Sequence, residues 1–146
     1  MNFDEFQQID SQLRKNRLNL FRLSASAPPA RKADIQYLEL CLKIRLPIQY
    51  KEFLQHFGGG EFGLINIFCA DSDSDWYLLK KVEEARRFAP NNFIPVSDDY
   101  AGGYYGFEFD SSATKSNFRY WNFDGGTVQT KYSDLLEFVV RTAYGE

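Results

Sequence analysis

The sequence has few of the side chains from which metal centres and nucleophilic active sites are built. Its 146 residues include two cysteines, Cys41 and Cys69, and a single histidine, His56. Metal sites made of several His or Cys ligands are unsupported, and a Ser-His-Asp or Cys-His site would depend on His56 alone. No serine or cysteine lies in a nucleophile-elbow sequence. We therefore expect no metal, no cofactor and no catalytic residue.

An excess of basic residues and a long apolar run are also missing. The 17 Lys and Arg are outnumbered by 20 Asp and Glu, so the net charge is −3. A nucleic-acid binder needs a basic surface, because phosphate neutralisation supplies most of its affinity. No run approaches the ~20 apolar residues that span a bilayer, and MNFDEFQQID does not resemble a signal peptide. We expect a cytoplasmic protein that binds neither nucleic acid nor membrane, whereas a basic protein partner is compatible with the charge.

The two cysteines are not expected to form a disulfide in a reducing compartment. Cys41 lies among the leucines of an expected helix, and Cys69 follows the apolar run from Leu64 to Phe68. Both are predicted to be small, buried hydrophobic residues.

Aromatic residues, in contrast, are plentiful: they make up 17% of the chain, with 14 Phe and 9 Tyr. Each buries a large area, so most of them are predicted to lie in a core. A chain of this length buries roughly 70% of the surface that its unfolded form exposes. We predict a single domain over residues 1–146.

The run LPIQYKEFLQHFGGGEFG, residues 46–63, combines a helix start, an amphipathic helix and a helix stop. Pro47 suits the first turn of a helix, where its missing N–H costs nothing. Apolar residues then recur at i, i+3, i+4 and i+7, which predicts a buried face formed by Tyr50, Phe53, Leu54 and Phe57. His56 lies off this face and is predicted to be a surface or boundary residue. Three glycines, 58–60, end the helix.

Gly58, Gly60 and Gly63 also satisfy the G-x-G-x-x-G spacing of dinucleotide sites. That motif needs a strand before it and a helix after it, so that the phosphates meet a helix N-terminus. Here a helix comes first and a strand follows. The spacing is therefore interpreted as a helix stop rather than a nucleotide site.

The remaining patterns predict helices and strands in the order of an α+β fold. Helices are expected over residues 4–15, 34–44 and 83–89 and after Ser133, with Asp34 and Ser133 near helix starts. Strands are expected over residues 64–70, 76–82, 93–97, 103–110, 117–123 and 127–132, with a hairpin at 124–126. Residues 17–33 could be a short strand or an irregular connector. We predict a mainly antiparallel sheet with helices packed on one side.

An acidic turn, DSDSD, places Asp71, Asp73 and Asp75 at the spacing of the first EF-hand ligands. The rest of a calcium loop is absent, because Trp76 stands where glycine is needed and Val82 where the bidentate glutamate should be. A solvated turn is favoured over a metal site. The same carboxylates could serve as a docking patch for a basic partner.

The segment from Asp98 to Tyr105 combines carboxylates, glycines and three tyrosines, and is the best candidate for a functional loop. Tyrosine offers a wide contact area and a polar tip, and it recurs in binding hot spots. The alternative is a turn that feeds a strand. Adjacent carboxylates, such as Asp98 and Asp99 or Glu83 and Glu84, point apart on a strand or a helix, so acid–base catalysis is not indicated. The predicted partner-binding residues are Asp71, Asp73, Asp75, Trp76, Asp98, Asp99, Tyr100, Tyr104, Tyr105 and Trp121.

The chain resembles the SMI1/KNR4 family of the SUKH superfamily over most of its length. The residues that carry the resemblance fall in several blocks in the family's order: Ile35, Glu39, Leu42, Leu46, Pro47, Tyr50, Lys51, Phe53, Leu54, Gly59 and Gly60, then Phe93, Ile94, Pro95, Val96, Asp98, Gly102, Gly103, Tyr120 and Trp121. The chain departs at Gly58, where many members carry Asn, and in the spacing of Asp98 and Asp99 from the glycines. The resemblance implies an SMI1/KNR4-like single domain.

What the resemblance implies about function is binding without turnover. Bacterial members are commonly immunity proteins, each of which binds and blocks a cognate polymorphic toxin, often a nuclease or a deaminase. Eukaryotic members suggest a regulatory scaffold in cell-wall synthesis instead. A small-ligand or enzymatic function in a cleft of the same fold is a third hypothesis. The partner's identity and the oligomeric state stay open.

Overall fold

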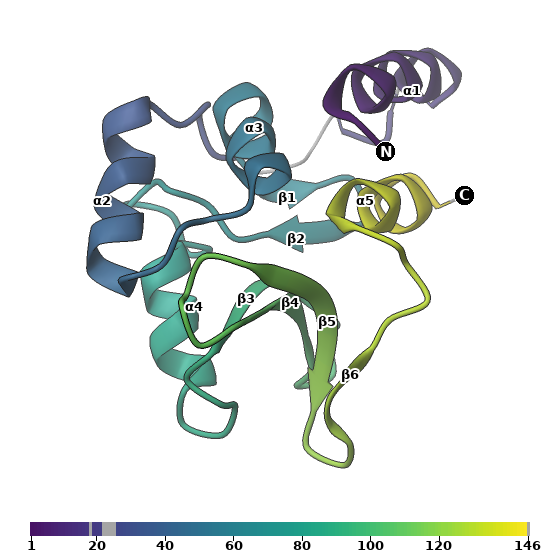
Figure 1. Ribbon diagram of the computed structural model, residues 1–146. Coiled ribbons are helices and arrows are strands. Elements are labelled where there is room, and N and C mark those ends of the chain that lie inside the picture. Colours follow the sequence, from purple (N-terminus) through teal and green to yellow (C-terminus); the bar gives the residue numbers. More distant parts are fainter. Residues whose placement is uncertain (18, 22–25, 146) are drawn as a thin grey trace.

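The computed structural model describes residues 1–17, 19–21 and 26–145, and Figure 1 shows helices gathered around a small sheet. The helices are α1 (Phe3–Asn16), α2 (Lys32–Leu42), α3 (Ile48–Phe57), α4 (Leu78–Ala85) and α5 (Leu135–Ala143). The strands are β1 (Gly60–Phe62), β2 (Ile65–Ile67), β3 (Phe93–Asp98), β4 (Tyr104–Phe109), β5 (Ser116–Asn122) and β6 (Gly126–Gln129). The predicted α+β class is confirmed. None of the described helices combines the length and apolar character needed to cross a membrane.

The strands form two antiparallel units. Strands β3, β4, β5 and β6 pair in chain order, while β1 and β2 make a separate short hairpin. The chain just beyond β2 ties this hairpin to the sheet, because the N–H of Phe68 donates to the carbonyl oxygen of Val96 at 2.8 Å. The predicted hairpin around residues 124–126 connects β5 to β6.

The two faces of the sheet have different neighbours. Successive residues of a strand point to opposite faces. On one face Tyr105 packs on α5, with its ring 4.5 Å from that of Phe138. On the other face Trp121 packs with Ala89, which lies just beyond α4. Both faces are therefore at least partly covered.

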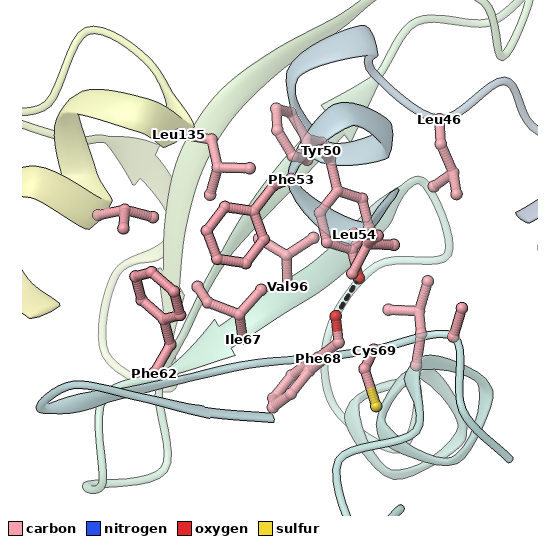
Figure 2. Close-up of a cluster of buried hydrophobic side chains, with 14 of the residues drawn as sticks. Leu46, Tyr50, Phe53, Leu54, Phe62, Ile67, Phe68, Cys69, Val96 and Leu135 are labelled. Atoms are coloured by element: carbon pink, nitrogen blue, oxygen red, sulfur yellow. Dashed lines mark hydrogen bonds between the residues drawn. The ribbon is translucent and has the colours of Figure 1, made fainter. Parts of the chain in front are cut away.

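Helix α3 supplies the centre of the core, as its apolar periodicity predicted. Tyr50, Phe53 and Leu54 are fully buried (Figure 2). The Tyr50 hydroxyl donates a hydrogen bond of 2.5 Å to the carbonyl oxygen of Phe68, which satisfies two polar atoms in an apolar environment. This bond joins α3 to the chain that leads from β2 towards α4.

The predicted strand over residues 76–82 is wrong, because this segment contains most of α4. Leu78, Val82 and Ala85 are spaced i, i+4 and i+7, and all three are buried. A short apolar run such as the one before Lys80 fits both a strand and a helix, and the helical period prevails when its face meets a core. The helix expected over 83–89 therefore begins earlier and ends at Ala85.

The expectation that both cysteines are buried holds for Cys69 and is wrong for Cys41. Cys69 is buried, Cys41 is exposed, and both are free. The buried face of α2 is formed by Ile35, Leu38 and Leu42. Cys41 lies about 100° around the helix from Leu42 and so faces away from the core.

The helix starts differ slightly from the prediction. Helix α2 begins at Lys32, and Asp34 accepts a hydrogen bond of 3.1 Å from the N–H of Arg31. At α5 the cap is Asp134 rather than Ser133, because the Asp134 carboxylate accepts from the N–H of Glu137 at 2.8 Å. The strand or connector expected over residues 17–33 includes positions 18 and 22–25, which lie outside the described residues.

The glycine stop after α3 gives a test of the fold. Gly58 has φ +78°, and a Cβ atom there would clash with the carbonyl oxygen of Ala27. We expect Gly58→Ala to lower the free energy of unfolding by about 3 kcal/mol or more, because strain and a backbone clash act together. Gly125→Ala is the matched control, since a Cβ atom there would meet its nearest neighbour at 3.4 Å. Urea denaturation monitored by circular dichroism measures both variants, and equal losses would contradict the assignment.

Candidate protein-binding surface

Asp99 organises the loop between β3 and β4. Its Oδ1 accepts hydrogen bonds of 2.8 Å from the N–H groups of both Ala101 and Gly103. Its Oδ2 accepts a hydrogen bond from the Tyr120 hydroxyl on β5. Gly103 has no room for a side chain, because a Cβ atom would lie 2.5 Å from both Asp99 Oδ2 and the Tyr120 hydroxyl oxygen. The loop is thus held in one conformation by the neighbouring strand.

Tyr100 projects from this loop into solvent. It has φ +61°, a conformation that a side-chain-bearing residue adopts only when its surroundings impose it. Its side chain is 70% exposed. The hydroxyl donates a long hydrogen bond of 3.4 Å to the carbonyl oxygen of Leu64, at the tip of the β1–β2 hairpin. Tyr100 therefore displays an aromatic ring that is tethered at its polar end.

The adjacent carboxylates Asp98 and Asp99 have opposite electrostatic environments. Burial raises the pKa of Asp98, and a hydrogen bond from Asn66 and the nearby Lys81 ammonium only partly offset it. Burial would also raise the pKa of Asp99, but the hydrogen bonds from Tyr120 and the loop N–H groups outweigh it and bring the pKa below its ordinary value. The two carboxylates bind different partners and point apart, as expected.

Three aromatic rings meet edge to face beside this loop. The ring of Trp121 lies 4.9 Å from that of Phe123, which lies 4.9 Å from that of Phe88. Trp121 is only 4% exposed, whereas Phe123 and Phe88 are 62% and 65% exposed. This row of rings reaches the loop, because a Cβ atom at Gly102 would lie 3.7 Å from the Phe123 ring. We call Phe88, Tyr100 and Phe123 the aromatic surface.

Phe88 and Phe123 were missed in the sequence. Phe88 lies in the turn after α4, and Phe123 begins the turn between β5 and β6. For Phe123 a signal was available in the sequence, because its apolar ring directly precedes the turn residues Asp124, Gly125 and Gly126. A side chain next to such a turn is seldom part of the core. The sequence patterns placed Phe88 in an expected helix over residues 83–89 and Phe123 in an expected strand over residues 117–123, so neither ring was predicted to be exposed.

The two chain segments that carry the aromatic surface, residues 88–114 and 120–130, have charged side chains of negative sign only. They contain no Lys or Arg. They do contain carboxylates at the loop and the turn: Asp98, Asp99 and Asp124. Basic residues come from α4 and the turn after it: Lys81 is paired with Glu84 at 3.5 Å, and the exposed Arg86 and Arg87 directly precede Phe88. The surface thus combines exposed rings with carboxylates at the loop and the β5–β6 turn, and has arginines on its α4 side only.

The structure separates Tyr104 from Tyr105. Tyr104 is half-buried on the Trp121 side, with its ring 6.1 Å from that of Trp121. Tyr105 points to the opposite face and packs on Phe138. Trp121 supports the aromatic surface from below rather than lining it. Of the predicted loop tyrosines, only Tyr100 is widely exposed.

The acidic turn is a second, separate group. Asn66 lies beside Asp98, and Phe68 pairs with Val96, so the chain from β2 runs away from the loop before it reaches Asp71. Asp71 accepts a hydrogen bond of 3.1 Å from the N–H of Asp73, as in a solvated Asx turn.

The neighbours of the turn are also distinct from those of the loop. Asp71 and Asp73 line a cavity of about 360 Å³ together with Arg31. Asp75 is exposed, and Trp76 is half-buried against the main core. The acidic turn and the aromatic surface are therefore not one continuous patch.

Groups suited to metal binding do not converge in the part of the chain that the structure describes. No three His, Cys, Asp or Glu side chains there could hold a metal ion together. His56 is exposed, and its ring lies 4.8 Å from that of Phe3.

Known proteins resemble the chain in both sequence and fold. A family model described as SMI1-KNR4 cell-wall matches residues 32–139. A crystal structure of a protein from Pseudomonas syringae pv. tomato is similar with a TM-score of 0.73 and 17% identity, over 96% of this chain and 99% of that chain. At this identity the likeness shows the fold alone. No curated protein matches the chain.

The two loop carboxylates predict opposite effects on stability. Because the pKa of Asp99 is lowered on folding, its charged form stabilises the protein above the unfolded pKa of about 3.9, and this contribution is lost as pH falls. We expect Asp99→Asn to cost about 1 kcal/mol at pH 7, a value discounted for solvent screening. Its difference from the wild type should shrink as pH falls towards about 3.

Asp98→Asn is the matched control, because the pKa of Asp98 is raised on folding. Its charged form opposes folding at pH 7, so neutralising it should leave stability unchanged or increase it. Urea denaturation at several pH values measures both variants. A parallel response of the two would show that the hydrogen bonds of Asp99 do not set its charge state.

Proposed function

Because the chain belongs to the SMI1/KNR4 family, we propose that it is a non-catalytic protein-binding domain, an immunity protein that neutralises a cognate polymorphic toxin of the nuclease or deaminase type. The observation that carries this proposal is the exposed aromatic surface among carboxylates, in hairpin segments without Lys or Arg. A toxin that acts on nucleic acid needs a basic groove for phosphates. An acidic, aromatic surface is complementary to such a groove.

Neutralisation would work by occupation of the groove. Rigid aromatic rings supply affinity when they enter a pocket and exclude water. Carboxylates speed the encounter with a basic surface and disfavour partners of the wrong charge. The hydrogen bonds that hold Asp99 lower the entropy lost on binding, because the loop is already ordered. No bond of the toxin or of its substrate needs to change.

A regulatory scaffold in cell-wall synthesis is the second candidate function. It is favoured by another set of exposed apolar residues on α2 and α3, namely Tyr37, Leu40 and Ile48. Lys32, Lys43 and Arg45 lie on or next to α2, so this end is more basic than the loop end. A scaffold would use both ends for different partners.

Co-expression tests the immunity proposal. The genes adjacent to the one for this chain would be searched for a nuclease or deaminase domain, which would be expressed with and without the chain while growth is measured. We expect restored growth and a one-to-one complex on size-exclusion chromatography. Continued toxicity without a complex would overturn the proposal, and retention of wall-synthesis proteins instead would favour the scaffold.

The acidic turn should contribute to the rate of encounter. Exchange of Asp71, Asp73 and Asp75 for Asn is expected to slow association with the toxin domain severalfold at low salt, because rim charges steer diffusion. Dissociation should change little. Surface plasmon resonance at two salt concentrations measures both rates, and an unchanged association rate would exclude the turn from steering.

A further inference from the structure

Exposed apolar side chains are concentrated at the loop end of the molecule. Among the described residues, eight large hydrophobic side chains are exposed: Tyr37, Leu40, Ile48, Leu64, Phe88, Tyr100, Phe123 and Val128. Four of the eight, Leu64, Phe88, Tyr100 and Phe123, belong to the β1–β2, β3–β4 and β5–β6 connections or to the turn after α4, and Val128 lies nearby on β6. Clustering of this kind marks an interaction site more often than scattered exposure does.

The aromatic surface is built to stay in place while exposed. Phe123 is held between Phe88 and the buried Trp121, with ring separations of 4.9 Å on each side. The Tyr100 ring is tethered through its hydroxyl to Leu64. Side chains that are already ordered lose little entropy on binding, which suits them to act as anchors.

The charge of the surface selects the kind of occupant. A second copy of the chain is disfavoured, because a two-fold contact would bring Asp98, Asp99 and Asp124 against their own equivalents. A cationic segment is favoured. Between the two cationic side chains, arginine fits better, since its planar guanidinium stacks on aromatic rings and binds carboxylates through two N–H groups.

We propose that Phe88, Tyr100 and Phe123 anchor the partner interface and receive an arginine-bearing segment of the partner protein. The guanidinium lies over an exposed ring and pairs with the neighbouring Asp124 or Asp99 carboxylate, while apolar residues of the segment contact Phe88. This inference rests on the proposed function, because it places the toxin's contact on this surface.

Selection of peptides tests the inference without any toxin. A random dodecapeptide phage library would be selected on the immobilised full chain. Enriched peptides should contain arginine beside apolar residues, and their affinity should fall about thirtyfold for the Phe88→Ser, Phe123→Ser double variant, as for loss of a hot spot. Enrichment of peptides without arginine, or no enrichment, would overturn the inference.

The opposite end of the molecule supplies the matched control. Leu40 and Ile48 are 76% and 72% exposed, so Leu40→Ser with Ile48→Ser removes similar apolar area elsewhere. Thermal melts would verify that both double variants are folded. Peptide affinity should stay within about twofold for the control, given that exposed residues outside a hot spot are nearly neutral. Equal losses in both variants would overturn the inference.

Replacement within the peptide separates stacking from charge. Replacement of the peptide's arginine by lysine keeps the positive charge but removes the planar guanidinium group. We expect it to weaken binding about tenfold. Equal binding of the lysine peptide would refute the arginine assignment.

The two proposals can fail separately. Toxicity that persists while peptides bind the surface would refute only the immunity proposal. Rescue from the toxin that survives Phe88→Ser with Phe123→Ser would refute only this inference.

Discussion

The hydrogen bond from the Tyr50 hydroxyl to the carbonyl oxygen of Phe68 is the interaction on which the rest of the arrangement depends. Burial raises the pKa of Tyr50 well above its ordinary value, so the hydroxyl keeps its proton and remains a donor. The bond fixes α3 against the segment after β2, and the N–H of Phe68 fixes the same residue to Val96 on β3. One residue thus links the central helix to the sheet. The position of the β3–β4 loop follows, because it continues directly from β3.

The β3–β4 loop lies outside the core and is ordered by hydrogen bonds. No side chain of residues 99–102 is buried in the core, so hydrogen bonds to a carboxylate fix the loop instead. Asp99 accepts them from two N–H groups of its own loop and from the Tyr120 hydroxyl of β5. Hydrogen bonds to a charged acceptor are stronger than neutral ones, which explains how a loop with two glycines keeps one conformation. The result is a surface whose shape is set from within the fold, while Tyr100 and Phe123 stay free for contact.

Much of the fold could be predicted because its helices and strands have clear periods. The face of α3, the glycine stop, the strands after residue 92 and the closing helix were all visible in the sequence. Helix α4 was not visible, because the apolar residues at its start fit both the two-residue period of a strand and the period of about 3.6 residues of a helix. Only contact with the core decides between the two. Site prediction was weaker for a physical reason. An aromatic residue in a strand is compatible with either face, so Tyr105 and Trp121 could not be distinguished from exposed rings. Phe88 and Phe123 lie just beyond α4 and β5, at element ends that the sequence patterns did not locate.

The core and the exposed aromatic surface are built from separate sets of residues. Tyr50, Phe53 and Leu54 contact only the interior, so changes at Phe88 or Phe123 leave their packing intact. Conversely, the aromatic surface is supported by the buried Trp121, by the Asp99–Tyr120 hydrogen bond and by the hydrogen bond from the Tyr100 hydroxyl to Leu64. New rings or charges can replace the exposed ones as long as these supports remain. Exposed side chains at the turns after α4 and β5 can therefore change while the core packing and these supports stay the same.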